Sequence, residues 1–130
     1  MLILTLRTDK PESEIGLYLD GDRIAYVSWA AHRQLAETLH RRIEDMLAAN
    51  NRQLKDIQAL CVYKGPGSFT GLRIGLSVAN SLAASYKVPI VGETGASWIE
   101  QGIERIVASD NDLIALPEYG APATITQPRK

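Results

Sequence analysis

A strand pattern that runs directly into a glycine-rich turn and a long helix pattern constrains the fold of this chain most strongly. The apolar run Ala59–Tyr63 is typical of a buried strand. Glycines and a proline follow in Gly65–Gly71, and apolar and small residues at helical spacing continue to Tyr86. A further strand pattern, Pro89–Gly92, comes next. A strand, a helix and a second strand in this order predict a parallel pair joined by a right-handed crossover, as in α/β proteins.

The residues before this unit predict an antiparallel meander. Leu2–Leu6 is a short apolar run. Within Ile15–Leu19, aliphatic residues alternate with polar or small ones. The turn residues Asp20–Asp22 precede a returning strand at Ile24–Ser28. Helical spacing then begins near Ala31 and continues to about Asn50.

These patterns predict one α/β domain with the order β-β-β-α-β-α-β-α, in which a mixed five-stranded sheet carries helices. The last helix is expected at 97–108, so the predicted domain covers residues 1–108. Residues 109–130 contain prolines and no sustained periodicity, and we interpret them as an extended tail. A short strand near 113–116 is an open alternative within that tail.

Composition indicates a folded, soluble domain. Of the 130 residues, 45% are hydrophobic and 22% are charged, which is ordinary for globular proteins. The net charge of -1 lacks the basic excess that strong independent binding to nucleic acid requires. Cys61 is the only cysteine, so no intrachain disulfide is expected. Because no secretory leader or membrane-length apolar run is present, we predict a cytoplasmic protein without membrane contact.

No set of side chains in the sequence predicts a catalytic, cofactor-binding or metal-binding site. His32 and His40 are about two helical turns apart, but no third metal ligand follows at suitable spacing. Cys61 falls inside a predicted buried strand. Ser68 and Thr70 lie on a turn without a histidine placed to activate them.

The glycine-rich turn matches neither common phosphate-binding pattern. Leu72 and Arg73 follow Gly71, where a P-loop needs Lys and then Ser or Thr, and the glycine spacing differs from that of the dinucleotide fingerprint. A phosphate cradle at the helix start and a purely structural turn, in which Ser68 or Thr70 caps the helix, remain the two interpretations.

The helix after this turn has more apolar surface than a helix on one face of a sheet requires. Two neighbouring stripes contribute to it, and they consist of Leu72, Leu76, Ala79, Ala83 and Tyr86, and of Ile74, Val78, Leu82 and Ser85. One interpretation is that this helix and the preceding one, which carries Leu35 and Leu39, offer a surface to a partner. The alternative is that the two helices pack on each other over their own sheet.

The segment Gly65–Gly75 reads GPGSFTGLRIG, which resembles the hallmark of the TsaB (YeaZ) family. The opening Leu2–Leu6, His32 before the first helix, the strand before Gly65, and Val88–Gly92 also agree with it. The similarity covers about residues 1 to 108.

The resemblance implies a ribonuclease-H-like fold of the actin, Hsp70 and sugar-kinase superfamily, with catalysis lost and no cofactor. It implies a scaffold subunit that pairs with the catalytic subunit TsaD and the ATPase TsaE to modify tRNA adenosine, and that contacts tRNA only through the complex. The first two helices form the family's contact, which also makes homodimers when the partner is absent. Carried onto this chain, the interface role falls on Leu35, Leu39, Ser68, Phe69, Thr70, Leu72, Arg73, Leu76 and Ala79.

Two departures from the family pattern leave alternatives open. Arg7 stands where family members carry an acidic residue at the end of the first strand, and a cation there would repel a metal. Typical members also carry a second domain of similar fold, which we do not expect within these 130 residues. The alternative functions are a self-sufficient homodimeric interaction module and a residual nucleotide-binding or hydrolytic enzyme.

Overall fold

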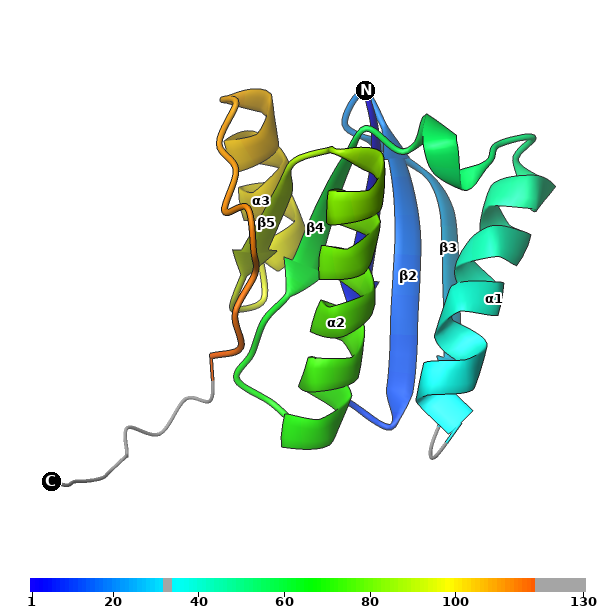
Figure 1. Cartoon of the computed structure of the whole chain (residues 1–130), viewed down its shortest axis with the longest axis vertical. Coiled ribbons are helices and arrows are strands. Elements are labelled where there is room, and N and C mark those ends of the chain that lie inside the picture. Colours follow the sequence, from blue (N-terminus) through cyan, green and yellow to red (C-terminus); the bar gives the residue numbers. More distant parts are fainter. Residues whose placement is uncertain (32–33, 119–130) are drawn as a thin grey trace, which may run out of the picture.

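The computed structural model describes residues 1–31 and 34–118, and its elements follow the predicted order (Figure 1). The strands are β1 (Leu2–Arg7), β2 (Glu12–Leu19), β3 (Asp22–Ala30), β4 (Ala59–Tyr63) and β5 (Ile90–Glu93). The helices are α1 (Leu35–Ala49), α2 (Phe69–Tyr86) and α3 (Trp98–Val107), and a short 3-10 turn covers Leu54–Asp56.

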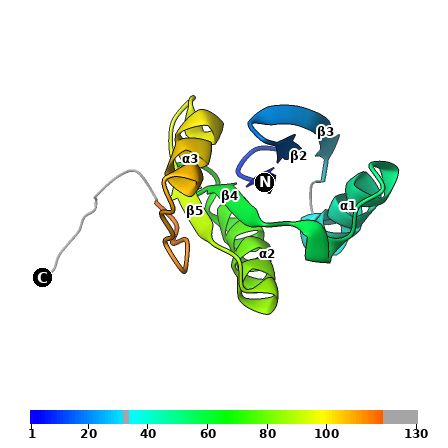
Figure 2. The same ribbon diagram turned by 90° about the horizontal axis from the view of Figure 1, so that it is seen from above.

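The five strands form one mixed sheet in the order β3-β2-β1-β4-β5. β1 pairs antiparallel with β2, where Leu4 lies opposite Leu17, and parallel with β4, where Leu4 lies opposite Leu60. α1 and α2 cover one face of the sheet and α3 covers the other (Figure 2). The predicted mixed five-stranded α/β architecture is therefore confirmed.

The central strand explains why the apolar run at the start of the chain has no polar alternation. Leu2, Ile3, Leu4 and Leu6 are all buried, because β1 is the middle strand of the sheet and α2 packs on it. By contrast β3 lies at the edge of the sheet, and along much of it exposed residues alternate with partly or fully buried ones. The core is completed by Leu39 and Ile43 of α1 and by Leu72 of α2, which are all fully buried.

Several element boundaries differ from those predicted. α1 begins at Leu35 and not near Ala31, and His32 lies outside the described residues. The short turn at Leu54–Asp56 was not predicted, because three residues carry no usable periodicity. The short strand considered at 113–116 is not formed, since these residues have no strand ladder in the structure. None of the helices in the described part of the chain is long and apolar enough to span a membrane.

Residues 110–118, which we call the strap, run along the edge of β5 and continue to α2 (Figure 1). The Ile90 amide donates to Asn111 Oδ1 over 3.1 Å, and the Asp112 amide donates to the Ile90 carbonyl over 2.8 Å. Farther along, the Asn80 side chain of α2 bonds both backbone groups of Ala115, at 3.0 and 2.9 Å. The strap thus pairs backbone groups that the edge strand would otherwise expose.

The guanidinium of Arg105 adds ion pairs between the strap and the rest of the domain. Arg105 of α3 forms ion pairs with Glu93 at 2.8 Å, with Asp110 at 2.7 Å and with Asp112. Asp112 also accepts a hydrogen bond from the Gly92 amide at 2.8 Å. Burial alone would raise the pKa of Asp112, but the bonds from Arg105 and Gly92 outweigh it, so this pKa lies below its ordinary value.

We expect Asp112→Asn to destabilise the fold in a pH-dependent way. Because the folded pKa of Asp112 is lowered, its ionised form contributes stability that is complete above the ordinary value of 3.8 and is lost as pH falls through the folded pKa. The difference in unfolding free energy between wild type and Asp112→Asn, measured in urea, should be constant near neutral pH and shrink below about pH 4.

Asp45→Asn on the exposed side of α1 is the control, and it should change the unfolding free energy by less than about 0.5 kcal/mol. A difference in unfolding free energy between wild type and Asp112→Asn that increased at lower pH would contradict the stabilising role of the ionised Asp112 carboxylate.

Candidate interaction site around helix α2

The glycine-rich segment packs on the turn that joins β1 and β2. The Thr8 hydroxyl donates to the Gly71 carbonyl over 2.7 Å, and the Ser68 amide donates to the Asp9 carbonyl over 3.3 Å. A Cβ on Gly71 would overlap the Thr8 carbonyl oxygen, and one on Gly75 would overlap Thr8 Oγ1. These two glycines therefore allow α2 to approach its own chain, which supports the structural interpretation of the turn.

The capping part of that interpretation is wrong in its detail. Ser68 is the residue before α2, but its side chain makes no capping hydrogen bond. The first-turn amides of α2 therefore do not donate a hydrogen bond to the Ser68 hydroxyl. Amides at the start of a helix have no acceptor within the helix.

Arg7, the last residue of β1, is neutralised within the chain. Its Nε lies 2.8 Å from Asp9 Oδ1, and its Nη2 lies 3.3 Å from Asp9 Oδ2. Its guanidinium carbon lies 3.7 Å from the centre of the Tyr63 ring, a cation–π distance. Burial alone would lower the pKa of Arg7, but the bond and charge of Asp9 raise it above the ordinary value.

Five of the nine predicted interface residues are in the core and cannot form a surface. They are Leu35, Leu39, Leu72, Leu76 and Ala79. The reason is that α2 packs on β1, β4 and β5 and also against α1, so its wide apolar surface is largely used within the chain. The two helices thus pack on each other over their own sheet, which is the alternative interpretation of the sequence. The other four, Ser68, Phe69, Thr70 and Arg73, are exposed.

The outer side of α2 nevertheless forms a groove with α1. At its start the groove has a volume of about 440 Å³ and is lined by Ala36, Phe69, Thr70, Arg73, Ile74, Ser77 and Val78. Phe69 is 53% exposed, and the Arg73 guanidinium carbon lies 5.2 Å from the centre of its ring. Ile74 and Val78 are half-buried, so they present part of their apolar surface to solvent.

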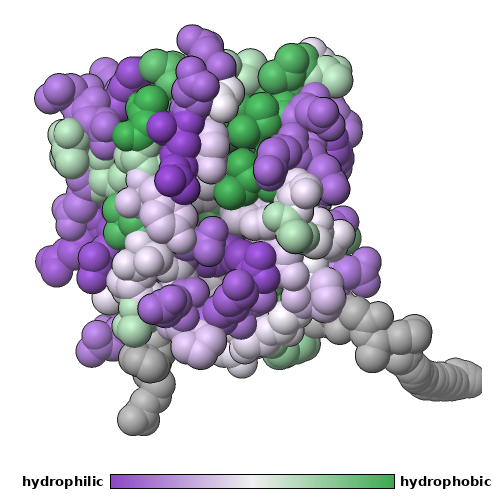
Figure 3. Space-filling view, turned by 180° about the vertical axis from the view of Figure 1, so that it is seen from behind, coloured by the Kyte–Doolittle hydropathy of each residue, from purple (hydrophilic) through white to green (hydrophobic). Residues whose placement is uncertain are grey.

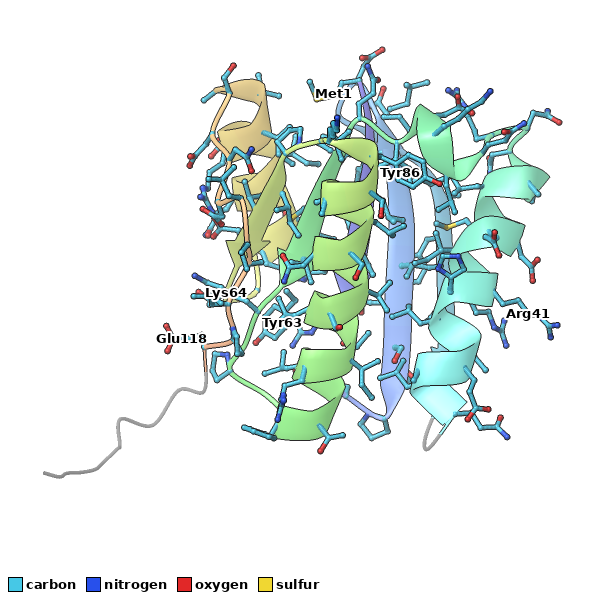
Figure 4. The ribbon with its side chains drawn as sticks, in the orientation of Figure 1. Met1, Arg41, Tyr63, Lys64, Tyr86 and Glu118 are labelled. Carbon is cyan, nitrogen blue, oxygen red and sulfur yellow. The ribbon has the colours of Figure 1, made fainter. Side chains whose placement is uncertain are left out.

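The groove continues along α2 to Tyr86. A second hollow shares Ser77 and Val78 with the first and adds His40, Leu54, Ser81, Leu82, Ser85 and Tyr86. In Figure 4, Tyr86 lies at the far end of α2 on the side of α1, whereas Arg41 points away from α2. We call this continuous surface the α1–α2 groove. Serines at 77, 81 and 85 leave space along it for another helix to approach.

The sequence indicated Ile74 and Val78 as apolar and Ser77 as a small residue of this helix, but none of the three was assigned to the predicted interface. The second apolar stripe of the helix pattern was the available signal for Ile74 and Val78. Hydrophilic and hydrophobic side chains are interspersed on the opposite face of the molecule, which carries α3 (Figure 3).

The remaining candidates for chemistry are weak. His40 is exposed, and its Nε2 lies 3.8 Å from Glu44. Among the described residues, no three His, Cys, Asp or Glu side chains form a group that could hold a metal. Cys61 is buried in β4, and burial raises the pKa of its thiol to about 12, which keeps it neutral and unreactive near pH 7.

The chain matches a known family over more than half of its 130 residues. Residues 28–100 match the family described as TsaD: tRNA N6-adenosine threonylcarbamoyltransferase. This span contains α1, β4, α2, β5 and the glycine-rich segment.

Curated relatives carry names from the same process. The chain is 30% identical over 115 residues to the tRNA threonylcarbamoyladenosine biosynthesis protein TsaB of Escherichia coli, which covers 84% of this chain and 49% of that protein. The TsaB of Haemophilus influenzae is 25% identical over 116 residues and covers 89% and 49%. The tRNA N6-adenosine threonylcarbamoyltransferase of Syntrophotalea carbinolica is 29% identical over 108 residues and covers 71% and 32%. The chain thus spans about half the length of these TsaB relatives.

Solved structures agree on the fold. YeaZ from Pseudomonas aeruginosa superposes with a TM-score of 0.69 at 24% identity, over 82% of this chain and 50% of that one. RuvC of Thermus thermophilus superposes with a TM-score of 0.51 at 11% identity, over 85% and 69%. The predicted ribonuclease-H-like, actin-like architecture is confirmed by these likenesses.

The contact between α2 and Thr8 predicts an asymmetric response to two alanine substitutions. Gly75→Ala should destabilise the fold by about 1–3 kcal/mol, because its Cβ would overlap the Thr8 side chain. Thr8→Ala in the same chain should recover part of this loss by removing the overlapping atoms.

Gly71→Ala should not be recovered by Thr8→Ala, since its Cβ would meet the Thr8 backbone carbonyl. Chemical denaturation of wild type, the three single variants and the two double variants gives the coupling free energies. Strict additivity of Gly75→Ala and Thr8→Ala would show that the close approach is absent.

Proposed function

Because the chain belongs to the TsaB (YeaZ) family and carries the TsaD family domain, we propose that it is a non-catalytic scaffold subunit in tRNA threonylcarbamoyladenosine biosynthesis. Its partner is a TsaD-like catalytic subunit, with which it forms a heterodimer. A TsaE-like ATPase joins the complex, and tRNA is contacted only through it.

The observation that carries the docking part of this proposal is the α1–α2 groove. It combines the exposed ring of Phe69 with the partly exposed side chains of Ile74 and Val78. Small residues alongside them, Ala36 and Ser77, let a helix approach closely. An elongated surface of this kind suits an apolar helix face laid into it, a recurrent mode of protein recognition.

The contacts of Arg7 support a role without catalysis. Arg7 and Asp9 neutralise each other, so neither carboxylate nor guanidinium is available to a metal–nucleotide pair. The close approach that the glycines permit is taken up by Thr8 and Asp9 of the same chain. A phosphate bound between these glycines and Thr8 or Asp9 would need that space.

The same groove would serve a homodimer when the TsaD-like subunit is absent. A helix of a second copy can occupy the space that a partner helix would take, since both present an apolar face with small residues. Homodimer and heterodimer then compete for one surface.

Phe69→Asp tests the docking surface. The aspartate lies in the first turn of α2, where the helix dipole favours an acidic residue, so the fold should be retained. The loss of the ring, which the docked partner would bury, should weaken binding to the TsaD-like subunit by at least about tenfold, as truncation of an aromatic anchor commonly does. Co-purification and calorimetric titration with the TsaD-like protein of the same genome measure the change.

Val107→Asp is the matched control, because Val107 is strongly exposed at the end of α3, on the other face of the sheet. It should bind like wild type. Equal affinities for wild type and Phe69→Asp would refute docking through the α1–α2 groove, and hydrolysis of ATP by the isolated chain would favour the enzyme alternative.

A further inference from the structure

A second pocket opens beside the α1–α2 groove, at the start of α2. It has a volume of about 340 Å³, and its polar lining comes mainly from Asp9, Lys10, Ser13, Ser68 and Thr70. It shares Thr70 and Ile74 with the groove, so the two form one continuous surface. We call it the Ser13 pocket.

Ser13 gives the first indication of a ligand in this pocket. It is only 1% exposed, and its hydroxyl oxygen has no hydrogen-bond partner among the described residues. A buried hydroxyl without a partner is costly, and most such groups in folded proteins are paired. The hydroxyl of Thr8 beside it is already used, since it donates to Gly71.

The charges around the pocket favour an anion. The positive end of the α2 dipole faces it, α2 is 18 residues long, and no side-chain cap from Ser68 covers the first turn. Lys10 is exposed and has no ion-pair partner in the described part of the chain. Asp9 is the one acidic residue that lines the pocket, and its carboxylate is bound to Arg7.

We propose that the Ser13 pocket receives a carboxylate side chain of the partner that docks in the α1–α2 groove. The carboxylate accepts hydrogen bonds from the Ser13 hydroxyl and from first-turn amides of α2, and it pairs with the Lys10 ammonium. This inference rests on the proposed function, and it names the chemistry of the partner: an apolar helix flanked by an Asp or Glu. Because the pocket and groove share Thr70 and Ile74, one partner element can reach both.

Ser13→Ala and Lys10→Gln test this site in titrations with the TsaD-like subunit. Each should weaken binding at least about tenfold, the usual effect of removing a hydrogen bond or charge from an enclosed carboxylate. Lys10→Gln should also reduce the salt dependence of the affinity. Ser13→Ala removes a hydroxyl that is unpaired in the isolated chain, so its thermal unfolding should not be impaired, and weaker binding then reports a lost contact.

Ser28→Ala and Lys55→Gln are the matched controls, since both residues are exposed and line neither the pocket nor the groove. Both should bind like wild type. If Ser13→Ala and Lys10→Gln also bound like wild type while Phe69→Asp did not, the carboxylate site would be refuted and the docking groove retained. Failure of wild type itself to bind would refute both proposals.

Inorganic phosphate added to the isolated, isotope-labelled chain distinguishes a small-anion site. Under the proposal, millimolar phosphate leaves the Thr70 and Gly71 amide signals almost unchanged, because the carboxylate is held chiefly by the docked partner. Saturable shifts of these signals, together with unchanged partner affinity in both variants, would assign the pocket to a free anion and overturn the proposal.

Discussion

The close contact between Thr8 and the first two turns of α2 is the constraint on which the rest of the molecule depends. It fixes the start of α2 against the end of β1, because Gly71 and Gly75 have no side chain that would hold the helix away. From that point α2 runs across β1, β4 and β5 beside α1, and its outer side is left as one wall of the α1–α2 groove. The same contact brings the positive end of the α2 dipole to the Ser13 pocket. Packing within the chain and the proposed docking surface therefore have one structural origin.

Much of the fold could be predicted from periodicity. Ala59–Tyr63 reads as a buried strand and forms β4 with the same bounds, because each of its residues is covered. The sequence also indicated the wide apolar surface of α2, but it did not show that the sheet and α1 cover most of that surface. Leu72 and Leu76 belong to the core and Phe69 and Ile74 line the groove, and this distinction depends on where α1 lies. The sequence pattern places residues on a helix face, whereas only the tertiary arrangement shows how much of that face remains.

The strap and the Ser13 pocket could not be predicted, since both join residues that are distant in sequence and follow no repeat. The side-chain amide of Asn80 bonds the backbone of Ala115, and nothing in the spacing of these two residues indicates that contact. At the other end of the strap, Glu118 donates its amide to the Lys64 carbonyl over 2.7 Å, and both residues lie together beside the start of the glycine-rich segment (Figure 4). The described part of the tail thus packs on its own sheet and stabilises the edge at β5.

The most direct measurement is methyl NMR of the isotope-labelled chain titrated with the TsaD-like subunit. Half-buried methyl groups report on both faces: Ile74 and Val78 line the groove, whereas Ile99 and Ile103 lie on α3. If the partner binds the α1–α2 groove, the signals of Ile74 and Val78 shift or broaden with saturation while those of Ile99 and Ile103 stay in place. Perturbation confined to Ile99 and Ile103 would contradict binding in the groove, since the partner would then bind the opposite face of the sheet.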